Sequence, residues 1–106
     1  MAEVEKTSLA LKGKDGKKTL YEKKSLTAGD VMKALECQEK MYAKDMTIRK
    51  QLEELISFNV ELFDNKEVTR DSILAGLSNL EVFPSLNATV MDVLGYDETA
   101  ETDEKK

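Results

Sequence analysis

The sequence predicts a mainly α-helical α+β fold, in which an N-terminal β-hairpin packs on a bundle of about four helices. Two observations lead to this fold class: a turn-forming segment separates two short strand-like segments, and apolar residues then recur at helical spacing over four segments. With 106 residues, the chain is long enough for one hydrophobic core. We expect a single domain over residues 1–96. The acidic residues 97–106 offer little to bury and are predicted to form a disordered tail.

The hairpin is expected over about residues 7–24. Residues 7–12 and 19–23 suit two short strands, and residues 13–16 contain two glycines and an aspartate. These residue types supply the positive φ angles that a reverse turn requires. Leu9 and Leu11 share one face of the first strand. A two-stranded hairpin is marginal alone, so it must pack on the segments that follow.

The first helix is predicted to begin after Thr27, which can cap the free amides while Asp30 occupies the first turn. It should end near residue 42 or 43. Its stripe is predicted from four residues at helical spacing: Val31, Leu35, Gln38 and Tyr42. Ala34 and Met41 are expected beside this stripe. Residues 43–45 contain no strong helix breaker, so the first two helices are either separate or nearly continuous.

The second helix has the strongest amphipathic pattern in the chain. Asp45 can cap its start, and Asn65 suits its end because asparagine tolerates the left-handed conformation. Its main apolar positions are Ile48, Leu52, Leu55, Ile56, Leu62 and Phe63. Phe58 and Val60 lie on flanking faces, where they either pack inside the domain or form a patch for a partner.

A short third helix is predicted over residues 70–77. Thr69 can cap it, and Ile73, Leu74 and Leu77 are expected to form its buried edge.

The fourth helix is predicted to open at Ser78, because Glu81 three residues later completes a capping-box pattern. Gly95 is expected to end it. Pro84 conflicts with an interior position, so either it bends the first turn or the helix begins near Ser85. The predicted apolar face consists of Leu80, Phe83, Leu86, Val90, Val93 and Leu94.

The composition argues against several classes of function. A formal charge of -5 disfavours nucleic-acid binding, which usually relies on a basic surface. The chain contains no histidine, so the usual catalytic triads cannot be built, and Cys37 lacks the commonest activating base. Neither EF-hand spacing nor a phosphate-binding glycine motif occurs, and no apolar run approaches the roughly 20 residues that span a bilayer. We therefore expect a cytoplasmic binding protein without enzyme activity, metal, cofactor or membrane contact.

The central region resembles a known protein family. Residues 52–65 (LEELISFNVELFDN) and residues 68–77 (VTRDSILAGL) resemble the tail assembly chaperones of long-tailed phages and prophages of Gram-positive bacteria. In that family, a helix ending in a hydrophobic-Phe-x-Asn step leads to a Thr-capped helix with the pattern D-x-[IL]-L-x-G-L. A last amphipathic helix and an acidic tail follow. The resemblance extends over about residues 26–96.

The resemblance implies a chaperone that binds the tape measure protein and helps recruit the major tail protein in the host cytoplasm. It also implies absence from the mature virion. Family members are often made additionally as a longer, frameshifted form, and homo-oligomers are compatible with this function. Six residues are candidates for a mixture of core and partner-binding surface: Phe58, Leu62, Phe63, Ile73, Leu77 and Phe83. The alternatives are a structural minor tail or connector protein of the virion and a small acidic adaptor or antitoxin-like binding protein.

Overall fold

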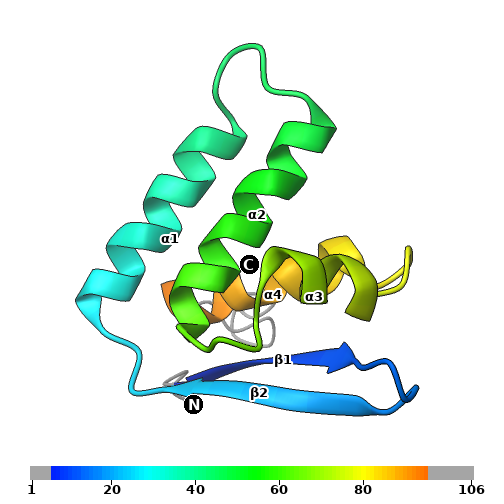
Figure 1. The fold of residues 1–106 in the computed structure, drawn as a ribbon. Coiled ribbons are helices and arrows are strands. Elements are labelled where there is room, and N and C mark those ends of the chain that lie inside the picture. Colours follow the sequence, from blue (N-terminus) through cyan, green and yellow to red (C-terminus); the bar gives the residue numbers. More distant parts are fainter. Residues whose placement is uncertain (1–5, 96–106) are drawn as a thin grey trace, which may run out of the picture.

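The structure, a computed structural model, describes residues 6–95 and confirms the predicted fold class. An antiparallel hairpin lies beneath a set of helices, and the first two helices stand away from it as a helical hairpin (Figure 1). The elements are β1 (Lys6–Lys12), β2 (Lys18–Lys24), α1 (Ala28–Met41), α2 (Ile48–Phe63), α3 (Arg70–Gly76) and α4 (Val82–Leu94). The predicted acidic tail over residues 97–106 lies outside the described residues.

The hairpin pairs Lys6 with Lys24 at one end and Lys12 with Lys18 at the other. In the turn, Gly16 adopts a positive φ of 84°, and no other residue of the loop does. Of the two glycines and the aspartate expected to supply positive φ angles, Gly16 alone does so. Asp15 instead accepts a hydrogen bond from the amide of Lys17 at 3.0 Å, which closes the loop through its side chain.

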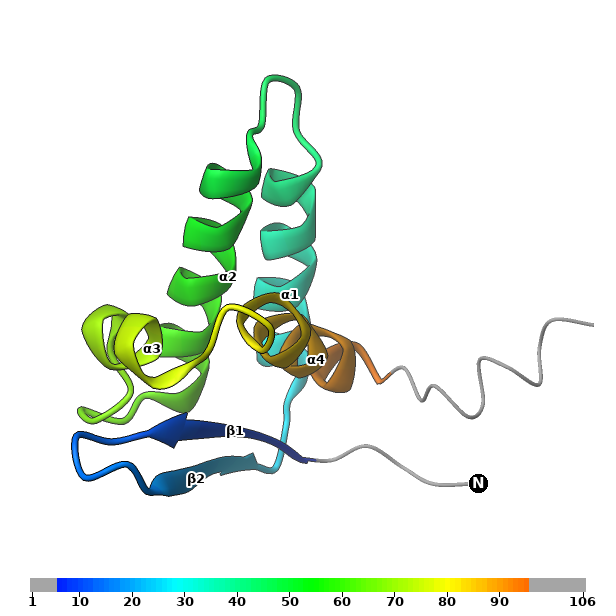
Figure 2. The same ribbon diagram turned by 90° about the vertical axis from the view of Figure 1, so that its right-hand side faces the viewer.

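Strand β1 is the hairpin strand that joins the core, because one face of it is buried against α3 and α4. Figure 2 shows α3 above the loop end of the hairpin. Gly76 makes this approach possible: a Cβ atom there would lie 3.0 Å from Cβ of Leu11 and 3.1 Å from the backbone nitrogen and oxygen of Lys12. At the other end of β1, Thr7 Oγ1 donates a hydrogen bond to Asp92 Oδ2 at 2.8 Å.

Helix α1 begins as predicted. The Thr27 hydroxyl accepts a hydrogen bond from the amide of Asp30, and the Asp30 carboxylate accepts one from the amide of Thr27. The predicted apolar stripe, however, is wrong. The helix buries Ala34, Cys37 and Met41, whereas the predicted stripe residues Leu35 and Tyr42 are exposed.

Helices α1 and α2 are separate, and the loop between them contains Asp45 in the left-handed region with φ 66°. The predicted cap at Asp45 is wrong, because Thr47 caps α2 by accepting a hydrogen bond from the amide of Lys50. Asp64, with φ 47°, takes the left-handed position at the end of α2 that was predicted for Asn65. An aspartate can fill this position because its short polar side chain tolerates that conformation.

Helix α3 is capped by Thr69 as predicted, with Ser72 completing a reciprocal pair of hydrogen bonds. Ile73 is buried and Leu77 is half-buried, but Leu74 is 45% exposed and does not belong to the buried edge.

Helix α4 begins at Val82, four residues after the predicted start. Ser78 and Glu81 form a turn in which the Glu81 carboxylate accepts a hydrogen bond from the amide of Ser78. Leu80 lies in this turn and is 81% exposed, so its predicted place on the buried face is wrong. Pro84 falls in the first helical turn, where its missing amide hydrogen has no intrahelical acceptor to lose. Gly95 ends the helix as predicted, with φ 83°.

The buried residues form one core to which both the hairpin and the helices contribute. Phe58 belongs to this core and Val60 packs against it, which settles the two alternatives for Phe58 in favour of packing. The core also encloses a polar pair. Asn59 and Thr89 are fully buried, and the Thr89 hydroxyl donates to Asn59 Oδ1 at 2.7 Å. Every buried polar side-chain atom among the described residues has a partner.

Candidate functional site

The outer side of α1 presents an exposed row of apolar side chains, which we call the α1 flank: Met32, Leu35 and Tyr42. Their exposed fractions are 67%, 41% and 76%. Their spacing of three and seven residues places them along one side of a helix. Single exposed apolar residues are ordinary in proteins, whereas an aligned row along a helix is a candidate contact surface.

The α1 flank is exposed because smaller and more flexible residues occupy the buried side of α1. Ala34 is fully buried and Cys37 Sγ lies 3.7 Å from the carbonyl oxygen of Glu54, so α1 packs close to α2. Leu35 follows Ala34, and Tyr42 follows Met41, by one residue. Each is therefore turned by about 100° from its buried neighbour, which carries it off the core.

Ile48 adds an apolar side chain at the far end of the helical hairpin. It is the first residue of α2 and is 70% exposed, and Tyr42 is the capping residue at the end of α1. Both residues flank the loop that lies farthest from the β-hairpin (Figures 1 and 2). The α1 flank thus runs toward a projecting apolar end.

The structure separates the six sequence-predicted contact candidates into two groups. Four are buried in the core: Phe58, Leu62, Phe63 and Ile73. Leu77 is half-buried, and Phe83 at the start of α4 is 38% exposed. Of the six candidates, Leu77 and Phe83 are therefore the two that offer surface to a partner in this conformation. Leu80, in the α3–α4 connection, is also exposed but was not among these candidates.

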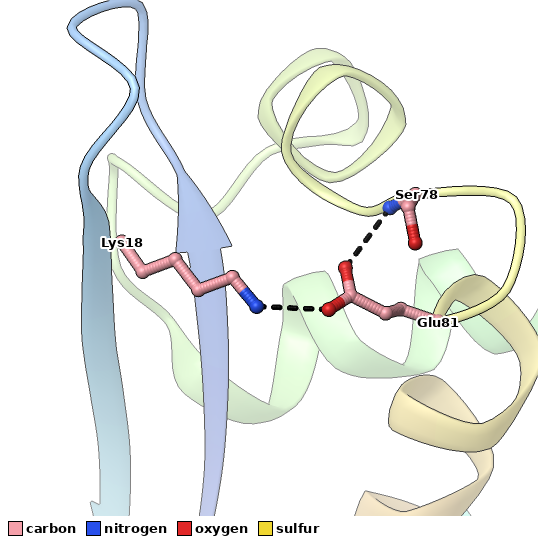
Figure 3. Close-up of polar contacts among 3 residues, drawn as sticks. All are labelled: Lys18, Ser78 and Glu81. Carbon is pink, nitrogen blue, oxygen red and sulfur yellow. Dashed lines mark hydrogen bonds and ion pairs between the residues drawn. The ribbon is translucent and has the colours of Figure 1, made fainter.

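An ion pair fixes that connection to the β-hairpin. Lys18 Nζ on β2 lies 2.8 Å from Glu81 Oε2, and Glu81 Oε1 accepts a hydrogen bond from the amide of Ser78 (Figure 3). The Lys18 hydrogen bond, followed by those from Ser78, lowers the pKa of Glu81 to about 2. Glu81 therefore stays ionised and serves both as a turn-closing acceptor and as a tether to the hairpin.

Comparison with known protein families decides the assignment. A family model described as phage tail chaperone protein matches residues 4–106, nearly the whole chain. The chain belongs to the phage tail chaperone family. Searches of curated proteins and of solved structures give no match for this tail chaperone. The resemblance to tail assembly chaperones predicted from residues 52–77 is thereby confirmed, and a tail assembly chaperone role follows.

The environment of Cys37 makes its thiol a poor nucleophile in the tail chaperone. Burial, followed by the charge of Glu54, raises the pKa of the Cys37 thiol to about 11, so the thiol is protonated at neutral pH and a poor nucleophile. Within residues 6–95, no group of three cysteine, aspartate or glutamate side chains is placed to hold a metal ion. No helix in this same range is long and apolar enough to cross a membrane.

The sequence contains a signal for the α1 flank. Periodicity places Leu35 and Tyr42 on one side of the helix, as the structure does, but that side is exposed instead of buried. Periodicity alone could not show that the adjacent stripe of Ala34, Cys37 and Met41 faces the core instead.

Proposed function

We propose that this tail chaperone binds the tape measure protein and helps recruit the major tail protein during tail morphogenesis, without catalysing a reaction. The exposed α1 flank is the observation that carries the proposal. A tape measure protein presents long helices with apolar stripes, and an amphipathic helix can lay such a stripe against a row of apolar side chains. Contact of this kind masks the stripe until the tail protein replaces the chaperone.

The mixed surface around the α1 flank favours reversible binding. Met32 is flexible and polarizable, and Tyr42 combines an apolar ring with a polar hydroxyl, so both adapt to different partner segments. Lys33 and Glu36 lie beside the row, and Glu39 lies within it between Leu35 and Tyr42, so charges of both signs adjoin the apolar side chains. Many weak contacts along a long partner give strong overall binding while each one can still dissociate.

The test is co-expression with the tape measure protein encoded by the same phage. The chaperone is expected to raise the soluble fraction of that protein and to co-purify with it. The double variant Leu35→Ser/Tyr42→Ser should weaken binding by at least about tenfold, which corresponds to 1.4 kcal/mol of lost apolar contact. The variant should still fold, because Tyr42 is 76% exposed and Leu35 is only partly buried, at 41% exposure. Circular dichroism of the purified variant checks this.

Two matched variants separate binding from folding. Leu80→Ser removes an apolar side chain that is 81% exposed elsewhere, and should retain the tape measure protein. Phe58→Ser should no longer bind the tape measure protein because it unfolds: deleting a buried aromatic side chain costs about 3–5 kcal/mol of stability. If Leu35→Ser/Tyr42→Ser folds and still co-purifies at wild-type yield, the α1 flank is not the contact surface.

We also propose that the protein acts in the host cytoplasm and is absent from the finished virion. The alternative is a structural minor tail or connector protein. Quantitative mass spectrometry of purified virions distinguishes the two, because a structural subunit is present in fixed stoichiometry whereas a chaperone has left the particle.

A further inference from the structure

A concave surface lies at the β-hairpin, away from the projecting end of α1 and α2 (Figure 2). A groove of about 480 Å³ lies between the loop end of the β-hairpin and α3, beside the point where Gly76 contacts β1. This volume is within the range of roughly 300–1,000 Å³ that is typical of ligand pockets. Leu11 and Tyr21 line it from the strands, and Ala75 and Ser72 line it from the helix. Its surface is more apolar than polar, so it can receive apolar side chains.

Helix α3 forms one wall of the groove. Gly76 touches β1 directly, as described above, while Ala75 beside it is exposed and faces the groove. Tyr21 is held at the wall because its hydroxyl donates to Glu67 Oε1 at 3.2 Å. The groove is therefore bounded by fixed backbone and by a restrained side chain.

The hairpin wall of the groove is strongly basic. Residues 6–24 contain seven lysines, one aspartate and one glutamate, a formal charge of +5 in a chain whose total is -5. Lys12 and Lys14 line the groove itself, and neither forms an ion pair with another described residue. Asp71 is the acidic residue on the helix side. The positive charge is thus concentrated on one wall.

Folding alone does not account for this lysine arrangement. Lys12 lies directly opposite Lys18, and Lys6 directly opposite Lys24, and like charges at such cross-strand positions destabilise a hairpin. Lys18 forms an ion pair with Glu81, and Lys6 forms one with Glu22. Lys12 has no such partner among residues 6–95. A positive charge that opposes folding and borders an apolar groove is suited to meet an acidic ligand.

We propose that the groove between the β-hairpin and α3 binds an acidic polypeptide segment, with an apolar side chain of the segment in the groove and its carboxylates on Lys12 and Lys14. A polypeptide is favoured over a nucleic acid for three reasons. The hairpin contains no arginine, the aromatic ring at the groove is held by Glu67, and the rest of the chain is acidic and would repel phosphates. This binding site is separate from the α1 flank and does not depend on the partner proposed for it.

The test measures binding of fluorescein-labelled peptides to the full chain by fluorescence anisotropy. The first peptide has twelve residues, with two leucines among glutamates and serines. In the second, glycines replace the leucines; in the third, lysines replace the glutamates. The first is expected to bind at least about tenfold more tightly than either of the others, because it alone satisfies both the groove and the lysines. Its affinity should fall as the salt concentration rises.

Variants locate the binding. Lys12→Glu/Lys14→Glu should weaken the first peptide by about tenfold, since two attractions become repulsions at the rim. Arg49→Glu/Lys50→Glu is the matched control, because it also changes the formal charge from -5 to -9 but lies on α2. It should change the affinity by less than about twofold. Ala75→Glu, at an exposed helical position, should weaken binding from the opposite wall.

Three outcomes would overturn the proposal: equal weakening by both double variants, equal affinity for all three peptides, or displacement of the acidic peptide by a twelve-nucleotide single-stranded DNA at equal concentration. The first indicates bulk charge, the second indicates no groove, and the third indicates a general polyanion site. Leu35→Ser/Tyr42→Ser should bind the peptide normally. A failure of this inference is therefore distinguishable from a failure of the proposed function.

Discussion

The buried pair Asn59 and Thr89 allows a quantitative test of the core. The Thr89 hydroxyl donates to Asn59 Oδ1 at 2.7 Å and lies 2.8 Å from the carbonyl oxygen of Leu86. The Asn59 amide nitrogen donates to the carbonyl of Leu55 at 2.8 Å. The two partners are not equivalent. Thr89 has a second acceptor within reach, whereas Asn59 Oδ1 accepts from no other donor within residues 6–95.

Thr89→Val should therefore destabilise the fold more than the loss of one hydrogen bond implies. Valine keeps the shape of threonine but leaves Asn59 Oδ1 buried without a donor, which costs about 1–3 kcal/mol. In an Asn59→Leu background no oxygen is left unsatisfied, so the same substitution should cost at most about 1 kcal/mol. The difference, a coupling energy of about 1–2 kcal/mol, is the predicted result of the double-mutant cycle.

Urea unfolding followed by circular dichroism measures these free energies of unfolding for the wild type, both single variants and the double variant. Thr89→Ser is the control, because it keeps the hydroxyl and should lose only about 0.8 kcal/mol for the buried methyl group. The reasoning fails if Thr89→Val costs less than about 0.5 kcal/mol, or if it costs the same in both backgrounds.

Three further predictions follow from the contacts described above. Gly76→Val should lower the free energy of unfolding by about 1–3 kcal/mol, measured in the same assay, because the new side chain meets Leu11 and backbone. In an NMR titration the Glu81 carboxylate should show a pKa of about 2, and this pKa should rise toward 4.5 in Lys18→Met. Because folding lowers the pKa of Glu81, the stability that this carboxylate contributes is present above pH 4.5. That stability is lost as the pH falls from 4.5 to 2. A normal titration in wild type would contradict the contact in Figure 3. Cys37 should react with a thiol reagent at pH 8 far more slowly in the native protein than in urea, because burial raises its pKa to about 11; equal rates would show an exposed thiol.

The order of elements and most helix caps could be predicted from the sequence because they depend on local residues. Thr27, Thr69 and Gly95 act within one turn of their own positions. The errors arise where tertiary packing selects between local alternatives. Thr47 and Asp45 are both good capping residues, and the left-handed turn at Asp45 decides in favour of Thr47.

The candidate site was less predictable for the same reason. Hydrophobicity identifies residues that can be buried, but the number of neighbouring elements determines which of them are. Phe58 and Phe63 lie in the C-terminal half of α2, which contacts several other elements, and they are buried. Tyr42 and Ile48 lie at the end of the helical hairpin where no other element covers them (Figure 1). Contact candidates chosen for strong hydrophobicity were therefore mostly core residues.

The hydrogen bond between Thr7 and Asp92 has a consequence for synthesis of the chain on the ribosome. The two residues are 85 positions apart, so the start of β1 cannot reach its partner until α4 has been made. At roughly 5–20 residues per second, this interval lasts about 4–17 s. During that time Leu9 and Leu11 have no α4 to cover them. The apolar face of β1 in this chaperone is therefore exposed to solvent and to other proteins for several seconds during its own synthesis.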